Sequence, residues 1–222
     1  EFYLLQKLVR ALGSDNVDHR LRQRDFSDDA LVPLFPWLGQ AIADLERLDT
    51  VLLIGSNIRK EQPLLGLRLR KAFLRGAQIM AVNPLDYEFT FNLAAKVVAG
   101  PDKLAPALAR IARGLAKAGK QALPAEVESW CAHGEPDAAE LAIAERLLRG
   151  ENVGVLLGAS ALSHPQAAVV RMLAEIVATL SGAKLGVLAD ANSAGAWLAG
   201  CVPQRGAGGE HVAQPGRTAA AM

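Results

Sequence analysis

The chain has 222 residues, of which 51% are hydrophobic and 21% charged, and its formal net charge is +1. This length and apolar content support a packed core, and the near-neutral charge argues against a nucleic-acid-binding protein, which needs a concentrated basic surface. Cys131 and Cys201 form no CxxC pair, so the sequence supports neither a disulfide framework nor a cysteine-ligated iron–sulfur site.

The two ends of the sequence have the character of internal segments of a longer protein. Residues 2–12 already follow an amphipathic helical pattern, with Gly13 as its stop, and no signal-peptide pattern precedes them. Residues 203–222 combine glycines, prolines and a short alanine run, as linkers do. We therefore expect a fragment. No stretch has the roughly 20 apolar residues of a membrane-spanning helix, so direct membrane insertion is not expected.

The first half of the chain predicts a strand–helix–strand unit. Residues 14–29 predict a loop, and residues 40–48 a helix with Ile42, Leu45 and Leu48 on one face. The apolar run 50–54 ends in Gly55-Ser56-Asn57, which is typical of a strand buried on both faces of a parallel sheet. A second such strand is expected at 78–82. The intervening helix runs from Pro63 to Gly76, and its apolar side is expected to hold Leu64, Leu65, Leu67, Leu69 and Phe73.

The second half repeats this pattern. Strands are expected at 153–157 and 184–188 around a helix at 166–180, and two further helices at 102–120 and 137–149 separate the units. The alternation predicts a three-layer α/β fold with parallel sheets. We expect a first lobe at 1–136 with N-terminal helices, a second, incomplete lobe at 137–205, and a linker-like tail at 206–222.

Two turns that follow predicted strands are candidate ligand sites. The Gly55-Ser56-Asn57 turn lies where open α/β sheets bind ligands. It is neither a GxGxxG nor a P-loop sequence, so a tight turn that needs Gly and Asn for backbone reasons is the favoured interpretation. Residues 158–162 resemble a serine-nucleophile elbow but lack its second glycine, which argues against hydrolase chemistry.

The histidines and one basic helix face also have ordinary explanations. No two of the four histidines share a helical face, so a zinc site is not expected; they are His19, His133, His164 and His211. A surface or capping role is favoured for His164. Five cations share one face of the 102–120 helix, and a solvated face is a commoner explanation than an acidic partner; they are Lys103, Arg110, Arg113, Lys117 and Lys120.

Residues 50–84 resemble the molybdopterin oxidoreductase family. In that family a strand ends in a Gly-Ser/Thr-Asn turn, Pro and an Arg-rich helix follow, and a Gly-Ala-Lys-like entry leads to a strand that ends in Asp-Pro-Arg. The matching segments here are 55–57, Pro63, Arg68 with Arg70, 76–78 and 83–85. Residues 16–20 are similar to the segment that precedes this motif. Residues 190–196, followed by Pro203, are similar to the family's Gly-Gln-Asn-Asn-Val-Gln-Gly-Ala loop. The resemblance covers about residues 2–205 and implies the family's layered α/β fold.

The departures from this pattern affect the expected cofactor contacts. In active members, the Asp of Asp-Pro-Arg helps to hold the nucleotide end of the pterin cofactor. Asn83 and Leu85 replace the Asp and the Arg here, which removes charge-assisted contacts. The resemblance leaves five vestigial cofactor positions, none of them a confident binding residue, and implies no catalytic or metal-binding residue; they are Gly55, Asn57, Asn83, Asn192 and Gly195.

The sequence of residues 55–63 is similar to the large subunit of bacterial respiratory complex I, NADH-quinone oxidoreductase, whose C-terminal region has the molybdopterin oxidoreductase fold. This resemblance implies that the parent protein supports electron transfer from NADH to quinone and carries iron–sulfur clusters in an N-terminal part absent here. It also implies that the parent lies peripherally at the cytoplasmic side of the inner membrane. For this chain it implies a cofactor-free scaffold, without activity of its own, that contacts other complex I subunits.

Two alternatives remain open from the sequence. The chain could be part of an active molybdopterin-dependent, formate-dehydrogenase-like oxidoreductase, or a small-molecule-binding doubly wound domain. The replacements at Asn83 and Leu85 argue against the first alternative, and the absent nucleotide fingerprints argue against the second.

Overall fold

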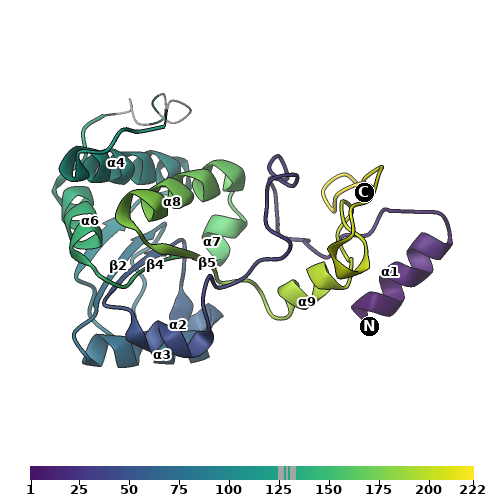
Figure 1. Ribbon diagram of the computed structural model, residues 1–222, viewed down its shortest axis with the longest axis horizontal. Helices are drawn as coiled ribbons and strands as arrows, with labels where there is room; N and C mark the ends of the chain where they lie inside the picture. The colour runs from purple at the N-terminus through teal and green to yellow at the C-terminus, as the bar shows by residue number, and fades with distance from the viewer. Residues whose placement is uncertain (125–127, 129, 131–133) are drawn as a thin grey trace. The chain divides into compact units, whose positions relative to one another are not determined.

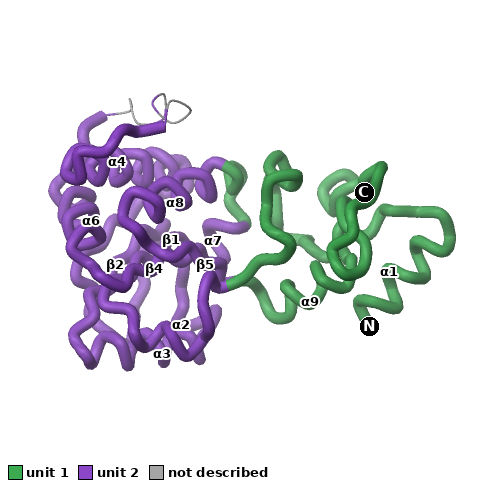
Figure 2. Tube along the Cα trace, in the orientation of Figure 1, with its two compact units in different colours: residues 1–37, 163–168, 189–222 green, residues 38–162, 169–188 purple. Residues whose placement is uncertain are grey.

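A computed structural model of the chain describes residues 1–124, 128, 130 and 134–222. Cys131 and His133 lie outside the described residues. The chain divides into two compact units, shown in Figure 2. The sheet unit comprises residues 38–162 and 169–188, and the terminal unit comprises residues 1–37, 163–168 and 189–222.

The sheet unit contains one five-stranded, all-parallel sheet with the strand order β3-β2-β1-β4-β5. Its central strands are β1 (Thr50–Ile54), β2 (Gln78–Asn83) and β4 (Val153–Leu157), and its edge strands are β3 (Ala95–Val98) and β5 (Lys184–Val187). Every residue of β1 and β4 is buried. These strands are continuous apolar runs because helices cover both faces of the sheet.

Alternate side chains of β1 separate the core into two layers. Leu52 and Ile54 contact the cluster formed with α4 (Pro101–Gly119), α6 (Ala138–Arg149) and α8 (Ala167–Ser181). Val51 and Leu53 contact the opposite cluster, formed with the 3-10 helix η1 (Ile42–Arg47), the short α2 (Ile58–Glu61) and α3 (Pro63–Leu74). Figure 1 shows the sheet between these two helical layers. The predicted three-layer α/β fold with a parallel sheet is confirmed.

The sheet differs from the sequence prediction in how its strands combine. The strands expected in separate lobes join one sheet, because β4 pairs with β1 along its whole length, from Thr50 opposite Val153 to Ile54 opposite Leu157. The boundary expected between residues 136 and 137 therefore falls inside the sheet unit. The strand β3 was not predicted, since only alternate residues of this edge strand are partly buried.

Two helices of the second layer also differ from the prediction. The expected helix at 40–48 is the 3-10 helix η1, and Ile42 is exposed, whereas Leu45 and Leu48 are buried as expected. In α3, Leu69 is buried, but Leu64 and Leu67, which were placed on the apolar side, are exposed. One side of α3 already fills the space above the sheet, so these two leucines face outward.

The terminal unit contains α1 (Phe2–Ala11), α9 (Ser193–Leu198) and the 3-10 helix η2 (Ala207–Gly209). Arg20 lies at its centre, where it forms ion pairs with Asp18 and Asp29. The residues expected to form a linker contact this centre, since the amide of Ala219 donates a hydrogen bond of 3.1 Å to Asp18. The tail thus packs against the unit instead of forming a free connection. No helix in the described parts of the chain is long and apolar enough to cross a membrane.

Candidate functional site

The candidate site lies at the carboxyl ends of β1, β2 and β4 in the sheet unit. The chain runs outward from β1 through β2 to β3 and then returns to place β4 on the other side of β1. Ligands of open α/β sheets bind at such a reversal of strand order. The structure brings Gly55, Asn57 and Asn83 to this edge together, opposite the loop that follows β4. This is the geometry expected from their positions after buried strands.

The loops that follow β1 and β4 pack directly against one another. A Cβ atom on Gly158 would lie 2.4 Å from Cβ of Ser56, and a Cβ atom on Gly55, where φ is +58°, would lie 2.5 Å from the backbone nitrogen of Ala161. The amide of Ser160 donates a hydrogen bond of 2.9 Å to the carbonyl of Gly55. Both glycines thus permit a close approach of backbone to backbone, and the crevice at the strand reversal is filled by the chain itself.

Asn83 connects the end of β2 to the turn after β1. Its Oδ1 atom accepts a hydrogen bond of 2.7 Å from the amide of Ser56, and its Nδ2 atom donates one of 3.1 Å to the carbonyl of the same residue. Asn83 is 3% exposed and Ser56 is fully buried. A side-chain amide offers both a donor and an acceptor, whereas a carboxylate only accepts. Asn83 therefore satisfies both backbone groups of Ser56, a role that an ionised Asp could not perform.

The short helix α7 (Ala159–Leu162) begins in the loop that follows β4. Glu61 accepts a hydrogen bond of 3.4 Å from the amide of Ala159, which is the first amide of that helix. Among the described residues, Ser56 Oγ and Asn57 Oδ1 are buried atoms without a hydrogen-bond partner. A serine hydroxyl can donate as well as accept, whereas an amide oxygen only accepts. These two atoms are polar groups of the turn that the described part of the protein leaves unpaired.

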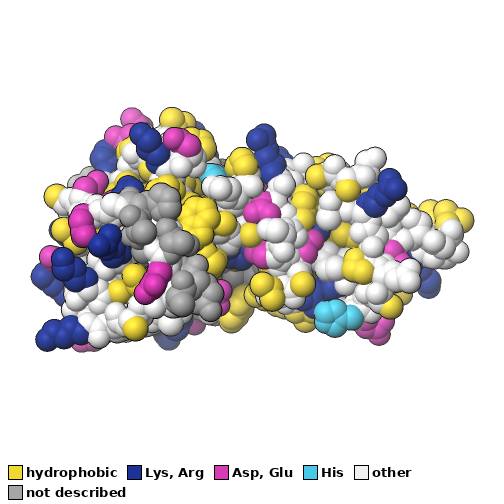
Figure 3. All heavy atoms as spheres, turned by 90° about the horizontal axis from the view of Figure 1, so that it is seen from above, with side chains coloured by type: hydrophobic (Ala, Val, Ile, Leu, Met, Phe, Trp, Pro, Cys, Tyr) yellow, Lys and Arg dark blue, Asp and Glu magenta, His cyan; other side chains and the backbone are white. Residues whose placement is uncertain are grey.

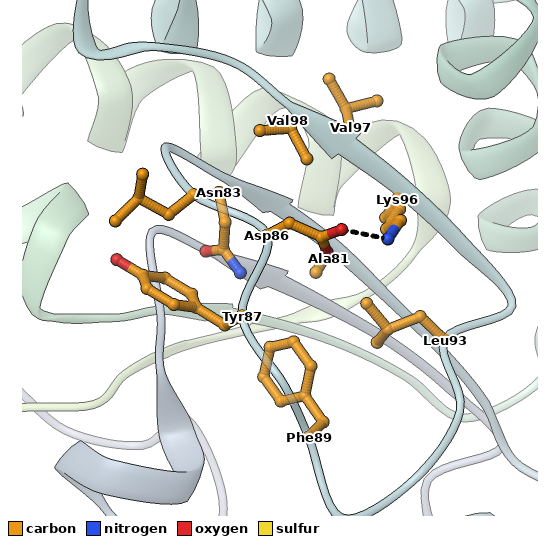
Figure 4. Close-up of a pocket in the computed structure, with 10 residues that line it drawn as sticks. Ala81, Asn83, Asp86, Tyr87, Phe89, Leu93, Lys96, Val97 and Val98 are labelled. Atoms are coloured by element: carbon orange, nitrogen blue, oxygen red, sulfur yellow. Dashed lines mark hydrogen bonds and ion pairs between the residues drawn. The ribbon is translucent and has the colours of Figure 1, made fainter.

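A shallow hollow lies beside the site, at the ends of β2 and β3. It contains about 170 Å³ of empty space, including its open mouth. Lys96 Nζ donates a hydrogen bond of 2.6 Å to Asp86, and Figure 4 shows the two side chains facing each other. Tyr87 and Phe89, from the loop between β2 and β3, also line the hollow. Pockets for drug-sized ligands occupy roughly 300–1,000 Å³. The hollow is too small to enclose a dinucleotide.

The other two vestigial positions, Asn192 and Gly195, belong to the terminal unit. Asn192 has a φ of +55°, and its carbonyl accepts a hydrogen bond of 3.0 Å from the amide of Ala196. A Cβ atom on Gly195 would lie 2.3 Å from Oδ1 of Asn192. The small residue at 195 thus makes room for the Asn192 side chain at the start of α9. These two residues contact each other, and they belong to a different unit from Gly55, Asn57 and Asn83.

His19 and His164 form hydrogen bonds within the terminal unit. His19 lies 2.8 Å from the carbonyl of Cys201 through Nδ1 and 3.0 Å from Oγ of Ser193 through Nε2. Nδ1 of His164 accepts a hydrogen bond of 3.0 Å from the amide of Gln166, consistent with the predicted capping role. Within the described ranges no three His, Cys, Asp or Glu residues gather in a way that could hold a metal ion.

The basic face of α4 is partly explained by ion pairs. Arg110 binds Glu140 at 2.6 Å, and Arg113 binds Glu135 at 2.6 Å. Figure 3 shows basic and acidic side chains interspersed on the face that it presents, rather than one large basic patch. Arg110 thus holds α4 to α6.

Comparisons with known proteins identify similar sequences. The chain matches the molybdopterin oxidoreductase family over residues 1–217. It is 35% identical to "Probable oxidoreductase YjgC" of Bacillus subtilis over 95 residues, which are 40% of this chain and 9% of that protein. It is 33% identical to the F420-dependent formate dehydrogenase subunit alpha of Methanocaldococcus jannaschii over 88 residues, 37% of this chain and 13% of that protein. The aligned segments thus span a small part of these relatives.

The pterin nucleotide cofactor that the resemblance implies does not fit the residues at the strand reversal. Gly55 and Gly158 bring the two loops into backbone contact, and Asn83 uses its amide on Ser56. Contacts within the protein therefore close this edge of the sheet.

Proposed function

The chain belongs to the molybdopterin oxidoreductase family, and from this premise we propose that it is a cofactor-free scaffold within a larger oxidoreductase. We further propose that the parent is the large subunit of NADH-quinone oxidoreductase, respiratory complex I, where it supports electron transfer from NADH to quinone. In this proposal the iron–sulfur clusters belong to other parts of the parent. The chain itself contacts neighbouring subunits and lies peripherally at the cytoplasmic side of the inner membrane.

The double hydrogen bond from Asn83 to Ser56 is the observation that supports the scaffold role most strongly. It makes the end of β2 a fixed part of the fold, with both partners buried. A residue that holds a cofactor must turn its polar groups toward it, whereas Asn83 turns both its amide oxygen and its amide nitrogen to the backbone of Ser56. The complex I assignment depends in addition on the sequence of residues 55–63.

An active molybdopterin-dependent oxidoreductase is the second candidate. It is favoured by the similarity to a formate dehydrogenase subunit, in which case the cofactor contacts would come from other parts of the parent. A small-molecule-binding doubly wound domain has less support, because the strand reversal is filled and the neighbouring hollow is small.

Purification of the natural parent protein through an affinity tag on its gene distinguishes these candidates. We expect it to co-purify with NADH–quinone reductase activity and to contain no molybdenum, because Asn83 directs its amide to Ser56 and the loops after β1 and β4 pack against each other. Metal analysis and the two activity assays are the measurements. About one molybdenum per chain together with formate-dependent reductase activity would support the second candidate and contradict the proposal.

A further inference from the structure

The outer face of α3 carries a stripe of exposed leucines. Leu64, Leu67 and Leu74 are 76%, 49% and 72% exposed, respectively. Buried residues of the same helix, among them Leu69 and Ala72, already pack on the opposite side. An amphipathic helix that covers a sheet normally presents polar residues to solvent, so these leucines are not needed to hold α3 on the sheet.

The exposed leucines follow the spacing of a coiled-coil seam. Leu64, Leu67, Lys71 and Leu74 are separated by three, four and three residues, so they occupy successive a and d positions of a heptad pattern. In the same register Leu69 is an f position, opposite the seam, and it is the side chain that is fully buried. The exposed seam therefore faces away from the sheet, and the helix α3 itself lies in the layer of α2 and α3 on one face of the sheet (Figure 1).

Cations border the seam on both sides. Arg68 and Arg75 occupy e positions and Arg70 a g position, and α3 contains no acidic residue. Glu46 of η1 contacts Arg68, Lys71 and Arg75, and the hydrogen bond from Arg68 lowers the pKa of that carboxyl. Glu46 is one carboxylate beside four cations, so the surface around the seam has an excess of positive charge; the cations are Arg68, Arg70, Lys71 and Arg75. The whole chain, in contrast, carries a net charge of only +1.

We infer that the seam formed by Leu64, Leu67, Lys71 and Leu74 docks an acidic amphipathic helix of a partner protein. The leucines pack against apolar a and d residues of that helix. The positive charge that Glu46 leaves in excess, with Arg70 at a g position, attracts Glu at the e and g positions of the partner. This surface is independent of the proposed function, since it does not involve the strand reversal.

The charge pattern argues against a second copy of the chain as the occupant. Two α3 helices packed along the seam would place arginines opposite arginines in either direction, because every charged e and g residue along this helix is Arg. Like charges at these positions oppose pairing. The complementary partner is therefore acidic.

Binding of a designed peptide to the whole 222-residue chain tests this inference. The probe is a fluorescent helical peptide of about three heptads with Leu at a and d and Glu at e and g. We expect saturable binding that weakens as salt is added, and at least roughly tenfold weaker binding of the same peptide with Lys at e and g. Leu74→Asp and Arg70→Glu should each weaken binding of the acidic peptide about tenfold.

Leu12→Asp is the matched control, because Leu12 is 78% exposed and follows a different helix. It should leave peptide binding unchanged. Urea unfolding of Leu74→Asp, Arg70→Glu and Leu12→Asp checks that each variant is folded. Equal binding of acidic and basic peptides, or no binding of either, would overturn the inference. Capture of the chain by anionic phosphatidylserine vesicles, lost in Leu74→Asp, with no peptide binding would assign the stripe to a lipid surface instead.

Discussion

Asn83→Asp is expected to destabilise the sheet unit by about 3 kcal/mol at neutral pH. The substitution removes the donor to the buried backbone carbonyl of Ser56 and places a carboxylate oxygen beside it. Oδ1 would still accept from the amide of Ser56, but the donor to the Ser56 carbonyl would be lost. The substitution restores the acidic residue of the family pattern, yet we expect it to weaken the fold. Urea unfolding of the variant and the unchanged chain measures the difference.

The destabilisation should depend on pH. Burial and the nearby carbonyl favour the protonated form of the introduced carboxyl, so its pKa in the folded state is raised above the unfolded value of about 3.9. A protonated carboxyl can donate to the Ser56 carbonyl and so imitates the amide. The loss of stability is therefore smallest below about pH 4 and grows as the pH rises through the folded-state pKa.

Asn16→Asp is the matched control for this experiment. Asn16 is exposed, and its Oδ1 atom accepts a hydrogen bond from the amide of Arg217. A carboxylate keeps this acceptor role, so the control should change stability by less than about 0.5 kcal/mol. A loss for Asn83→Asp that stayed small, or that shrank with rising pH, would show that the amide donor of Asn83 is not needed.

The sequence predicted the local elements better than their assembly. Apolar runs bounded by turn residues located β1, β2 and β4, since strands buried on both faces need continuous apolar residues, and the repeated strand–helix–strand pattern located the edge strand β5. The pairing of β1 with β4 joins residues about a hundred positions apart, and local patterns do not contain this information. The strand β3 was missed because a short edge strand of alternating burial has no continuous apolar run.

The sequence placed the candidate positions at the strand ends, but it did not predict the role of Asn83. The sequence indicated a lost carboxylate, whereas the structure shows an amide that satisfies both backbone groups of Ser56. The residue type could have indicated this role, because Asn at the end of a strand can supply both a donor and an acceptor to the neighbouring turn. Similarly, the sequence pattern placed Leu64 and Leu67 on the apolar side of the helix that begins at Pro63. In the structure α3 has apolar residues on two faces, and these two leucines are exposed.

Arg110→Met is expected to cost about 3–5 kcal/mol of unfolding free energy, because it leaves a buried carboxylate without its cation. The side chain of Glu140 is 0% exposed, and Arg110 donates to it from Nε at 2.8 Å and from Nη2 at 2.6 Å. These hydrogen bonds raise the pKa of Arg110. Glu140 also accepts from the amide of Asp137 in the capping box of α6, so the pair holds α4 against the first turn of α6. Urea unfolding measures the loss.

A second substitution and a neighbouring pair separate charge burial from lost packing. Adding Glu140→Gln to Arg110→Met should recover much of the lost stability, because a neutral amide is cheaper to bury than an unpaired carboxylate. Arg113→Met removes the cation of a more exposed pair with Glu135 on the same helix and should cost less than about 1 kcal/mol. Similar losses for Arg110→Met and Arg113→Met, or no recovery in the double variant, would mean that the arginine stems rather than the buried charge hold α4 in place.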